Sequence, residues 1–93
     1  MDTVWEVPSP NSLLLYDTEG GRLVFDLRSR QTHLLSDNAA EILTLLRQAP
    51  GTLDSLAASF ELDPQDHDKT PLIDRLDEIL RELDTAGLVE PQP

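Results

Sequence analysis

The stretch Leu23–Leu46, LVFDLRSRQTHLLSDNAAEILTLL, contains the change of hydrophobic period that decides the fold. Its second half is apolar at intervals of three and four residues (Ala39, Ile42, Leu43, Leu46), which is typical of one helical face. Its first half alternates at every second residue, as a β-strand does. The two faces of that strand hold Leu23, Phe25 and Leu27 on one side and Arg22, Val24 and Asp26 on the other.

Strands are predicted on both sides of this alternating segment. Ser12–Asp17 is apolar, and the Thr-Glu-Gly-Gly turn at 18–21 joins it to Arg22–Leu27 as a hairpin. A tight link at 28–30 leads to a third strand, Gln31–Leu35. The lead at 1–11 contains two prolines and is expected to be strand-like or coil.

Three helices are predicted after the strands. Ser36 or Asp37 caps the first, which stops near Pro50, and Thr52 caps a short second helix that reaches Phe60. An acidic link at 61–70 follows, containing Asp63, Asp66, His67 and Asp68, and we expect a solvated loop there rather than a metal site.

The third helix is the longest. It begins at Thr70-Pro71 and ends near Ala86, because Gly87 can take the left-handed conformation that ends a helix, and Leu88-Val89 then packs back on it. The tail at 90–93 and the first residues, 1–4, are expected to be disordered or extended. Strands followed by helices predict one α+β domain over residues 1–93, winged-helix-like, with a three-stranded antiparallel sheet and three helices.

Composition excludes several classes of function. Eighteen acids against seven bases give a net charge of −11, which argues against binding to DNA phosphates or anionic membranes. There is no cysteine, and no apolar run approaches the roughly 20 residues that a membrane span needs. The first ten residues lack a secretory signal, so a cytoplasmic protein is expected. We find no nucleophile, phosphate loop or metal set, and therefore expect no enzyme activity, cofactor or metal.

The long helix has an apolar face that is wider than one small neighbour requires. We expect Leu76, Ile79 and Leu83 in the core, and Ile73 and Leu80, on one flank, in a binding groove. The same helix carries five acids and two arginines, so it is unsuited to the major groove of DNA.

The basic residues are concentrated on the second hairpin. Arg22, Arg28 and Arg30 lie there, whereas residues 48–93 hold eleven acids and three bases. An ordinary solvated hairpin and a patch that steers an acidic peptide both fit this pattern. Edge strands of a small sheet can accept a peptide as an additional strand, and Gln31–Leu35 contains no proline that would prevent it.

The order of three segments resembles the PqqD-like peptide chaperones, also called RiPP recognition elements. The segments are Leu23–Leu43, PGTLDSLAASF (Pro50–Phe60) and LIDRLDEILRELDTAGLVE (Leu72–Glu90), which are similar to the family's hxLN/DxxAxxIhxLhxG, TxxELAxxh and hxxhLxxLxxxGLh patterns. Trp5 and the segment at 31–35 look most like the subgroup from HPr-kinase-related system A clusters. The acidic link at 61–70 looks long for the family.

This resemblance implies a non-catalytic domain that captures the leader of a ribosomally made precursor peptide by strand addition and presents it to a peptide-modifying enzyme. Arg30 and Arg75 would contact acids of the leader. The implied peptide-binding residues are Arg30, Gln31, Thr32, His33, Leu34, Leu35, Leu72, Ile73, Arg75, Leu76, Ile79 and Leu80. The alternatives are a winged-helix DNA-binding domain and a self-associating adaptor, with a homodimer formed through a sheet edge or by strand swapping.

Overall fold

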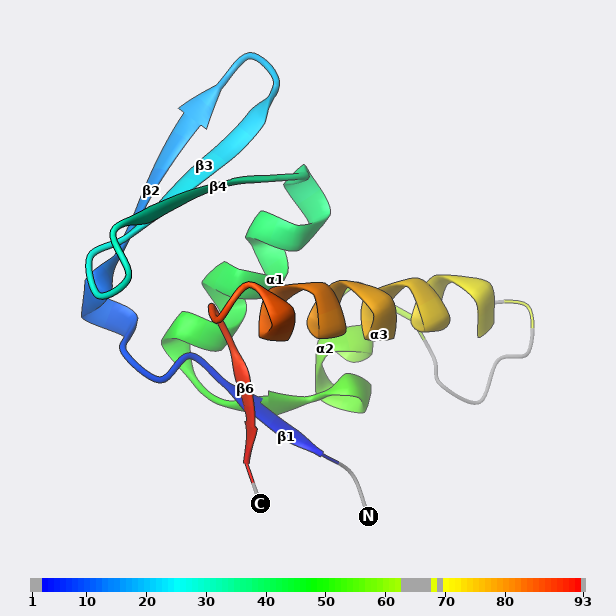
Figure 1. Ribbon diagram of the computed structural model, residues 1–93. Coiled ribbons are helices and arrows are strands. Elements are labelled where there is room, and N and C mark those ends of the chain that lie inside the picture. The colour runs from blue at the N-terminus through cyan, green and yellow to red at the C-terminus, as the bar shows by residue number, and fades with distance from the viewer. Residues whose placement is uncertain (1–2, 63–67, 69, 93) are drawn as a thin grey trace.

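Two antiparallel sheets and three helices make up the part of the chain that the computed structural model describes, residues 3–62, 68 and 70–92 (Figure 1). The predicted α+β class, with a three-stranded antiparallel sheet and three helices, is confirmed. The sheet consists of β2 (Leu13–Thr18), β3 (Gly21–Asp26) and β4 (Gln31–Leu35), in that order. The helices are α1 (Asp37–Gln48), α2 (Leu53–Ser59) and α3 (Thr70–Thr85).

A second sheet, which the sequence pattern did not predict, joins the two ends of the chain. Its central strand is β1 (Val4–Glu6), which pairs antiparallel with β5 (Gly51–Thr52) on one side and β6 (Glu90–Gln92) on the other. Figure 1 shows β1 and β6 side by side, away from the first sheet. Of the two expectations for the tail, disordered or extended, the structure shows the extended one for residues 90–92.

The predicted helix ends are confirmed by their hydrogen bonds. The Ser36 hydroxyl accepts a bond from the Ala39 amide at 3.2 Å, at the start of α1. Thr52 begins α2 with a reciprocal pair of bonds to Ser55, so two free amides of the first turn are satisfied. Gly87 ends α3 with φ of +78°, and the Leu88 amide bonds the Leu83 carbonyl at 2.9 Å.

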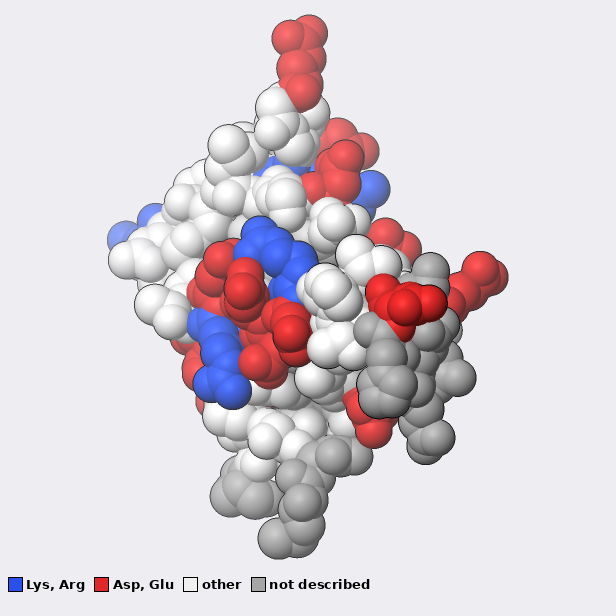
Figure 2. Space-filling view, turned by 90° about the vertical axis from the view of Figure 1, so that its right-hand side faces the viewer, with Lys and Arg blue, Asp and Glu red and all other residues white. Residues whose placement is uncertain are grey.

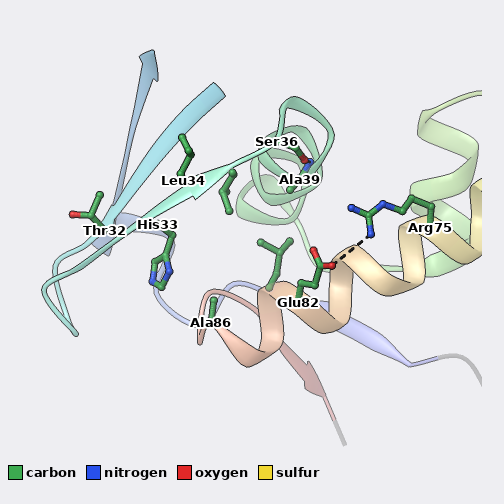
Figure 3. Close-up of a pocket in the computed structure, with 10 residues that line it drawn as sticks. Thr32, His33, Leu34, Ser36, Ala39, Arg75, Glu82 and Ala86 are labelled. Atoms are coloured by element: carbon green, nitrogen blue, oxygen red, sulfur yellow. Dashed lines mark hydrogen bonds and ion pairs between the residues drawn. The ribbon is translucent and has the colours of Figure 1, made fainter. Parts of the chain in front are cut away.

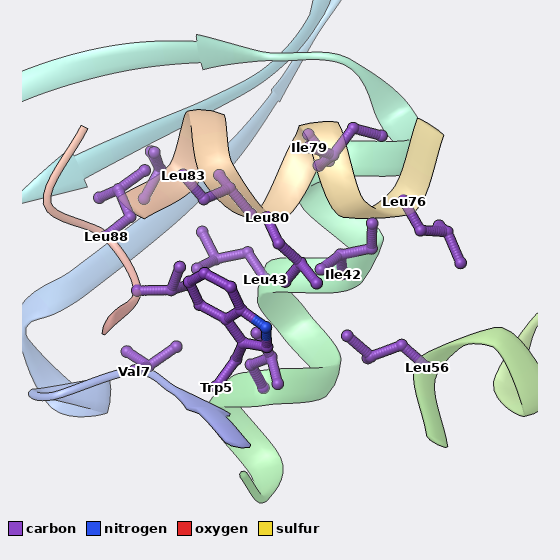
Figure 4. Packing of buried hydrophobic residues seen from close by; sticks show 14 of the residues in the cluster. Trp5, Val7, Ile42, Leu43, Leu56, Leu76, Ile79, Leu80, Leu83 and Leu88 are labelled. Atoms are coloured by element: carbon purple, nitrogen blue, oxygen red, sulfur yellow. The ribbon is translucent and has the colours of Figure 1, made fainter. Parts of the chain in front are cut away.

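The core lies between the three helices and the inner sides of both sheets (Figure 4). Leu76, Ile79 and Leu83 are buried, as predicted, and Leu88 packs back on them as expected. Trp5 of the central strand β1 is only 7% exposed and belongs to the same cluster. The second sheet therefore contributes the largest side chain of the core.

The β2–β3–β4 sheet has one buried and one open face. Cross-strand partners share a face, and the buried one carries Leu13, Val24 and Asp26, which are at most 2% exposed. The strand face that reads as more apolar, with Leu23 and Phe25, is the outer one and is only half-buried. An acid therefore occupies the inner face of β3, while apolar side chains line its outer face.

The acidic link at 61–70 falls mostly outside the described residues, since positions 63–67 and 69 are not described. The predictions for Asp63, Asp66 and His67 therefore stay predictions. Within the described ranges, no helix has the length and apolar character that crossing a membrane requires.

Candidate functional site

Strand β4 is an edge of the first sheet. It pairs with β3 on one side, from Arg22↔Leu35 to Asp26↔Gln31, and no other described strand pairs with it. The backbone groups on its second side are therefore available to an added strand. The sequence left open whether Gln31–Leu35 is an edge, and the structure places it there.

A groove of about 500 Å³ runs between this edge and α3 (Figure 3). Ser36 and Ala39, at the start of α1, line it where β4 ends. In Figure 3 His33 points toward Ala86 across the groove, whereas Leu34 points away from α3. The side chains of successive β4 residues thus point to alternate faces of the sheet, while all four residues from Thr32 to Leu35 border the groove. The groove is lined by Thr32, His33, Leu34, Leu35, Ser36, Ala39, Arg75, Glu82, Leu83 and Ala86.

The structure brings part of the predicted peptide-binding set together in this groove. Residues 32–35 and Arg75 line it, as expected from the resemblance. Gln31 lies on the same strand but does not line the groove, and neither does Arg30, in the preceding turn. Thus the strand side of the predicted site agrees well with the groove, and the helix side agrees only at Arg75.

Two of the predicted helix residues lie on the wrong flank. Leu80 is 0% exposed, so it is a core residue and the expectation that it lines a groove was wrong. Ile73 is half-buried and packs against the core. Neither lines the groove, because they extend the apolar stripe on the side away from Arg75 and Ala86.

A second hollow of about 230 Å³ lies on the other side of Arg75. The predicted residues Leu72, Leu76 and Ile79 line it, and Leu72 is 51% exposed there. Arg75 borders both hollows, so they form neighbouring parts of one surface along α3. Its lining residues are Asn38, Phe60, Leu62, Leu72, Arg75, Leu76 and Ile79.

Arg75 is already paired with acids of its own helix. Its guanidinium lies 3.0 Å from the Glu78 carboxylate and 3.5 Å from that of Glu82. The hydrogen bond to Glu78 and the charge of Glu82 raise the pKa of Arg75 further above its ordinary value. Figure 2, which faces the N-terminal end of α3, shows acidic and basic side chains interleaved there. An acid on a bound peptide would therefore compete with Glu78 and Glu82 for Arg75.

The turn between β3 and β4 is held by a buried carboxylate. One Asp26 oxygen accepts the Arg28 amide at 2.9 Å and lies 3.7 Å from the Arg28 guanidinium. Arg28 also reaches the Gly87 carbonyl at 3.4 Å, so the turn is tied to the end of α3. These contacts fix one end of β4 relative to α3, and hence the width of the groove. Arg30 makes no ion pair with any described residue.

The sequence pattern missed five groove residues. Ser36 and Ala39 were read only as a helix cap and a core position, and Leu83 only as core. Glu82 and Ala86 were not considered, although they lie seven and eleven residues after Arg75 and so share its helix face. That spacing is the signal that could have identified them.

Among residues 3–62, 68 and 70–92, no group of three or more acidic or histidine side chains is placed to hold a metal ion. The chain matches no protein-family model, no curated protein and no solved structure.

Proposed function

We propose that this chain is a non-catalytic peptide-binding domain. It captures an extended segment, the leader of a ribosomally made precursor, and presents it to a modifying enzyme. The observation that carries the proposal is the position of β4, because its unpaired edge forms one wall of the groove against α3. Backbone bonds to that edge would supply affinity that is independent of the peptide's sequence.

The lining of the groove supports selection among peptides. Side chains of an added strand alternate, so every second one would enter the space beside His33, Leu83 and Ala86. The volume of the groove, about 500 Å³, lies within the roughly 300–1,000 Å³ range that is usual for ligand pockets. The hollow at Leu72 offers an apolar position for a residue further along the same peptide.

The charges favour a peptide that is not strongly acidic. Glu82 also lines the groove and pairs with Arg75, and Glu78 pairs with Arg75 on the same helix, so the groove has no net positive charge that would attract an acidic peptide. Of the two arginines predicted to contact acids of the leader, Arg75 is already paired with Glu78 and Glu82. Arg30, in the turn before β4, forms no ion pair with a described residue. No observation favours DNA binding, because the exposed side of α3 is predominantly acidic.

Ala86→Arg tests the proposal, since the new side chain would occupy the groove. The assay titrates the isotope-labelled chain with the synthetic leader half of the precursor encoded nearest to its gene, and follows backbone amide shifts. We expect shifts at 31–36 and 75–86 in the wild type and at least a tenfold weaker Kd in the variant, as for loss of about 1.4 kcal/mol or more.

Ala58→Arg is the matched control, because Ala58 is exposed on α2 and the variant adds the same charge away from the groove. Its Kd should equal that of the wild type. Shifts that appear elsewhere, or binding that Ala86→Arg leaves intact, would show that the groove is not the peptide site.

A further inference from the structure

The outer face of the β2–β3–β4 sheet is apolar and carries no charge. Its cross-strand rows are Leu14↔Phe25↔Thr32 and Tyr16↔Leu23↔Leu34. Three of these side chains are well exposed: Leu14 (39%), Tyr16 (55%) and Leu34 (63%). An exposed contiguous apolar patch on a protein surface can mark a site of protein–protein contact.

The charged residues of these strands all lie on the opposite face. Asp17, Arg22 and Asp26 alternate with the outer residues, and Asp17 and Arg22 pair with each other at 3.2 Å. In a chain of net charge −11, a three-stranded surface free of charge is unusual. A strongly charged partner would gain nothing there, so an uncharged partner surface suits it best.

The two ends of this face carry opposite charges. Glu19 lies in the β2–β3 turn at one end, and Arg30 lies in the β3–β4 turn at the other, with the length of β3 between them. Both are exposed, and neither forms an ion pair with a described residue. Figure 1 shows the β2–β3 hairpin extending beyond the helices, so these ends are accessible.

We propose that the outer face of this sheet pairs with the same face of a second copy of the chain. The two-fold axis lies between the two faces and runs across the strands, so the row of Tyr16 in each copy packs on the row of Leu14 in the other. The same axis places Glu19 of each copy beside Arg30 of the other, so both ion pairs form at once. The surface is thus complementary to itself in its charges and in its apolar rows.

The association is expected to be weak. Three strands about 4.8 Å apart with five paired residues each give a footprint of roughly 250 Å², well below the ~800 Å² per partner of a standard interface. The dimer face and the peptide groove share Thr32 and Leu34, but Tyr16 and Glu19 do not line the groove, so variants at these two positions test the dimer separately from the peptide site.

Sedimentation of the full chain from about 10 µM to about 1 mM tests the proposal over the range in which such a small interface associates. We expect reversible dimers in the wild type and only monomers for Tyr16→Glu. Tyr16 is exposed and lies outside the core, and circular dichroism checks that the variant keeps the fold. A wild type that stays monomeric throughout, or dimers that Tyr16→Glu does not change, would overturn the proposal.

Charge reversal tests the two-fold arrangement. Glu19→Arg and Arg30→Glu should each weaken the dimer about fivefold, because each places like charges together at two symmetric contacts. The double variant should return to within about twofold of the wild type. Asp84→Arg is the control: it changes the net charge as Glu19→Arg does, yet should not weaken the dimer. If Glu19→Arg strengthens association as Asp84→Arg does, net charge alone governs it and the arrangement is wrong.

Discussion

Leu80→Ala tests whether Leu80 belongs to the core or to the peptide groove. Leu80 is 0% exposed and lies in the same cluster as Trp5, whereas Leu72 on the same helix is 51% exposed. Truncating a buried leucine to alanine destabilises a protein by about 2–5 kcal/mol, because the transfer free energy is lost and a cavity remains. Half of the Leu72 side chain is already in water, so Leu72→Ala should lose about 1 kcal/mol or less.

Urea unfolding followed by the fluorescence of Trp5, the only tryptophan, measures both losses. With a slope of about 1.5 kcal/mol/M, we expect the midpoint to fall by about 2 M for Leu80→Ala and by less than about 0.7 M for Leu72→Ala. Equal shifts would refute the assignment of Leu80 to the core. So would a folded Leu80→Ala chain that has lost peptide binding while Leu72→Ala retains it.

Two further predictions concern the ends of α3 and β3. Gly87→Ala should lower the free energy of unfolding by about 1 kcal/mol, because an alanine is strained at φ of +78°. Its control, Gly20→Ala, should change the free energy of unfolding by less than about 0.5 kcal/mol, since no atom lies within 4 Å of the added Cβ. Asp26→Asn should lower the free energy of unfolding by about 1–2 kcal/mol, because it weakens the bonds to Arg28. Its control, Asp17→Asn, should lower that free energy by less than about 0.5 kcal/mol, because the Asp17 carboxylate is 89% exposed. Thermal unfolding of the four variants checks both pairs, and a control that loses as much as its partner would contradict the reasoning.

Local signals predicted the first sheet and the helices well. The Thr-Glu-Gly-Gly turn, the Ser36 and Thr52 caps and the Gly87 terminus each depend on a few adjacent residues, so they can be read from the sequence. The second sheet could not be read in this way. Its strands hold two or three residues each, too few to show alternation, and they come from the two ends and the middle of the chain.

The helix side of the groove shows a different limit of the pattern. The apolar stripe of α3 identifies which residues face the core, but both of its flanks border that stripe. Nothing within the helix indicates which flank faces β4. Which flank of α3 faces β4 depends on how α1 connects the sheet to the other helices. In the structure, the flank with Arg75 and Ala86 faces β4, and the flank with Ile73 and Leu80 does not. The inner Asp26 is a similar case: alternation puts it on the face of Val24, but alternation alone does not indicate which face of the strand is buried, and the contact with Arg28 that holds its carboxylate comes from the turn.

The position of β4 beside α3 links the two proposals. An unprotected edge strand is usually a site where sheets of different molecules pair, and β4 contains neither proline nor lysine to prevent this. However, α3 forms the opposite wall of the groove (Figure 3) and leaves room beside β4 for one extended chain. A second folded copy would bring its own helices against α3, whose acids would repel theirs. The edge is therefore suited to a peptide, and self-association is left to the uncharged outer face, where Glu19 and Arg30 can meet without involving α3. Because Thr32 and Leu34 belong to both surfaces and Arg30 is a contact in both proposals, saturating peptide should weaken the dimer, and a dimer Kd that saturating peptide leaves unchanged would show that the two surfaces do not overlap.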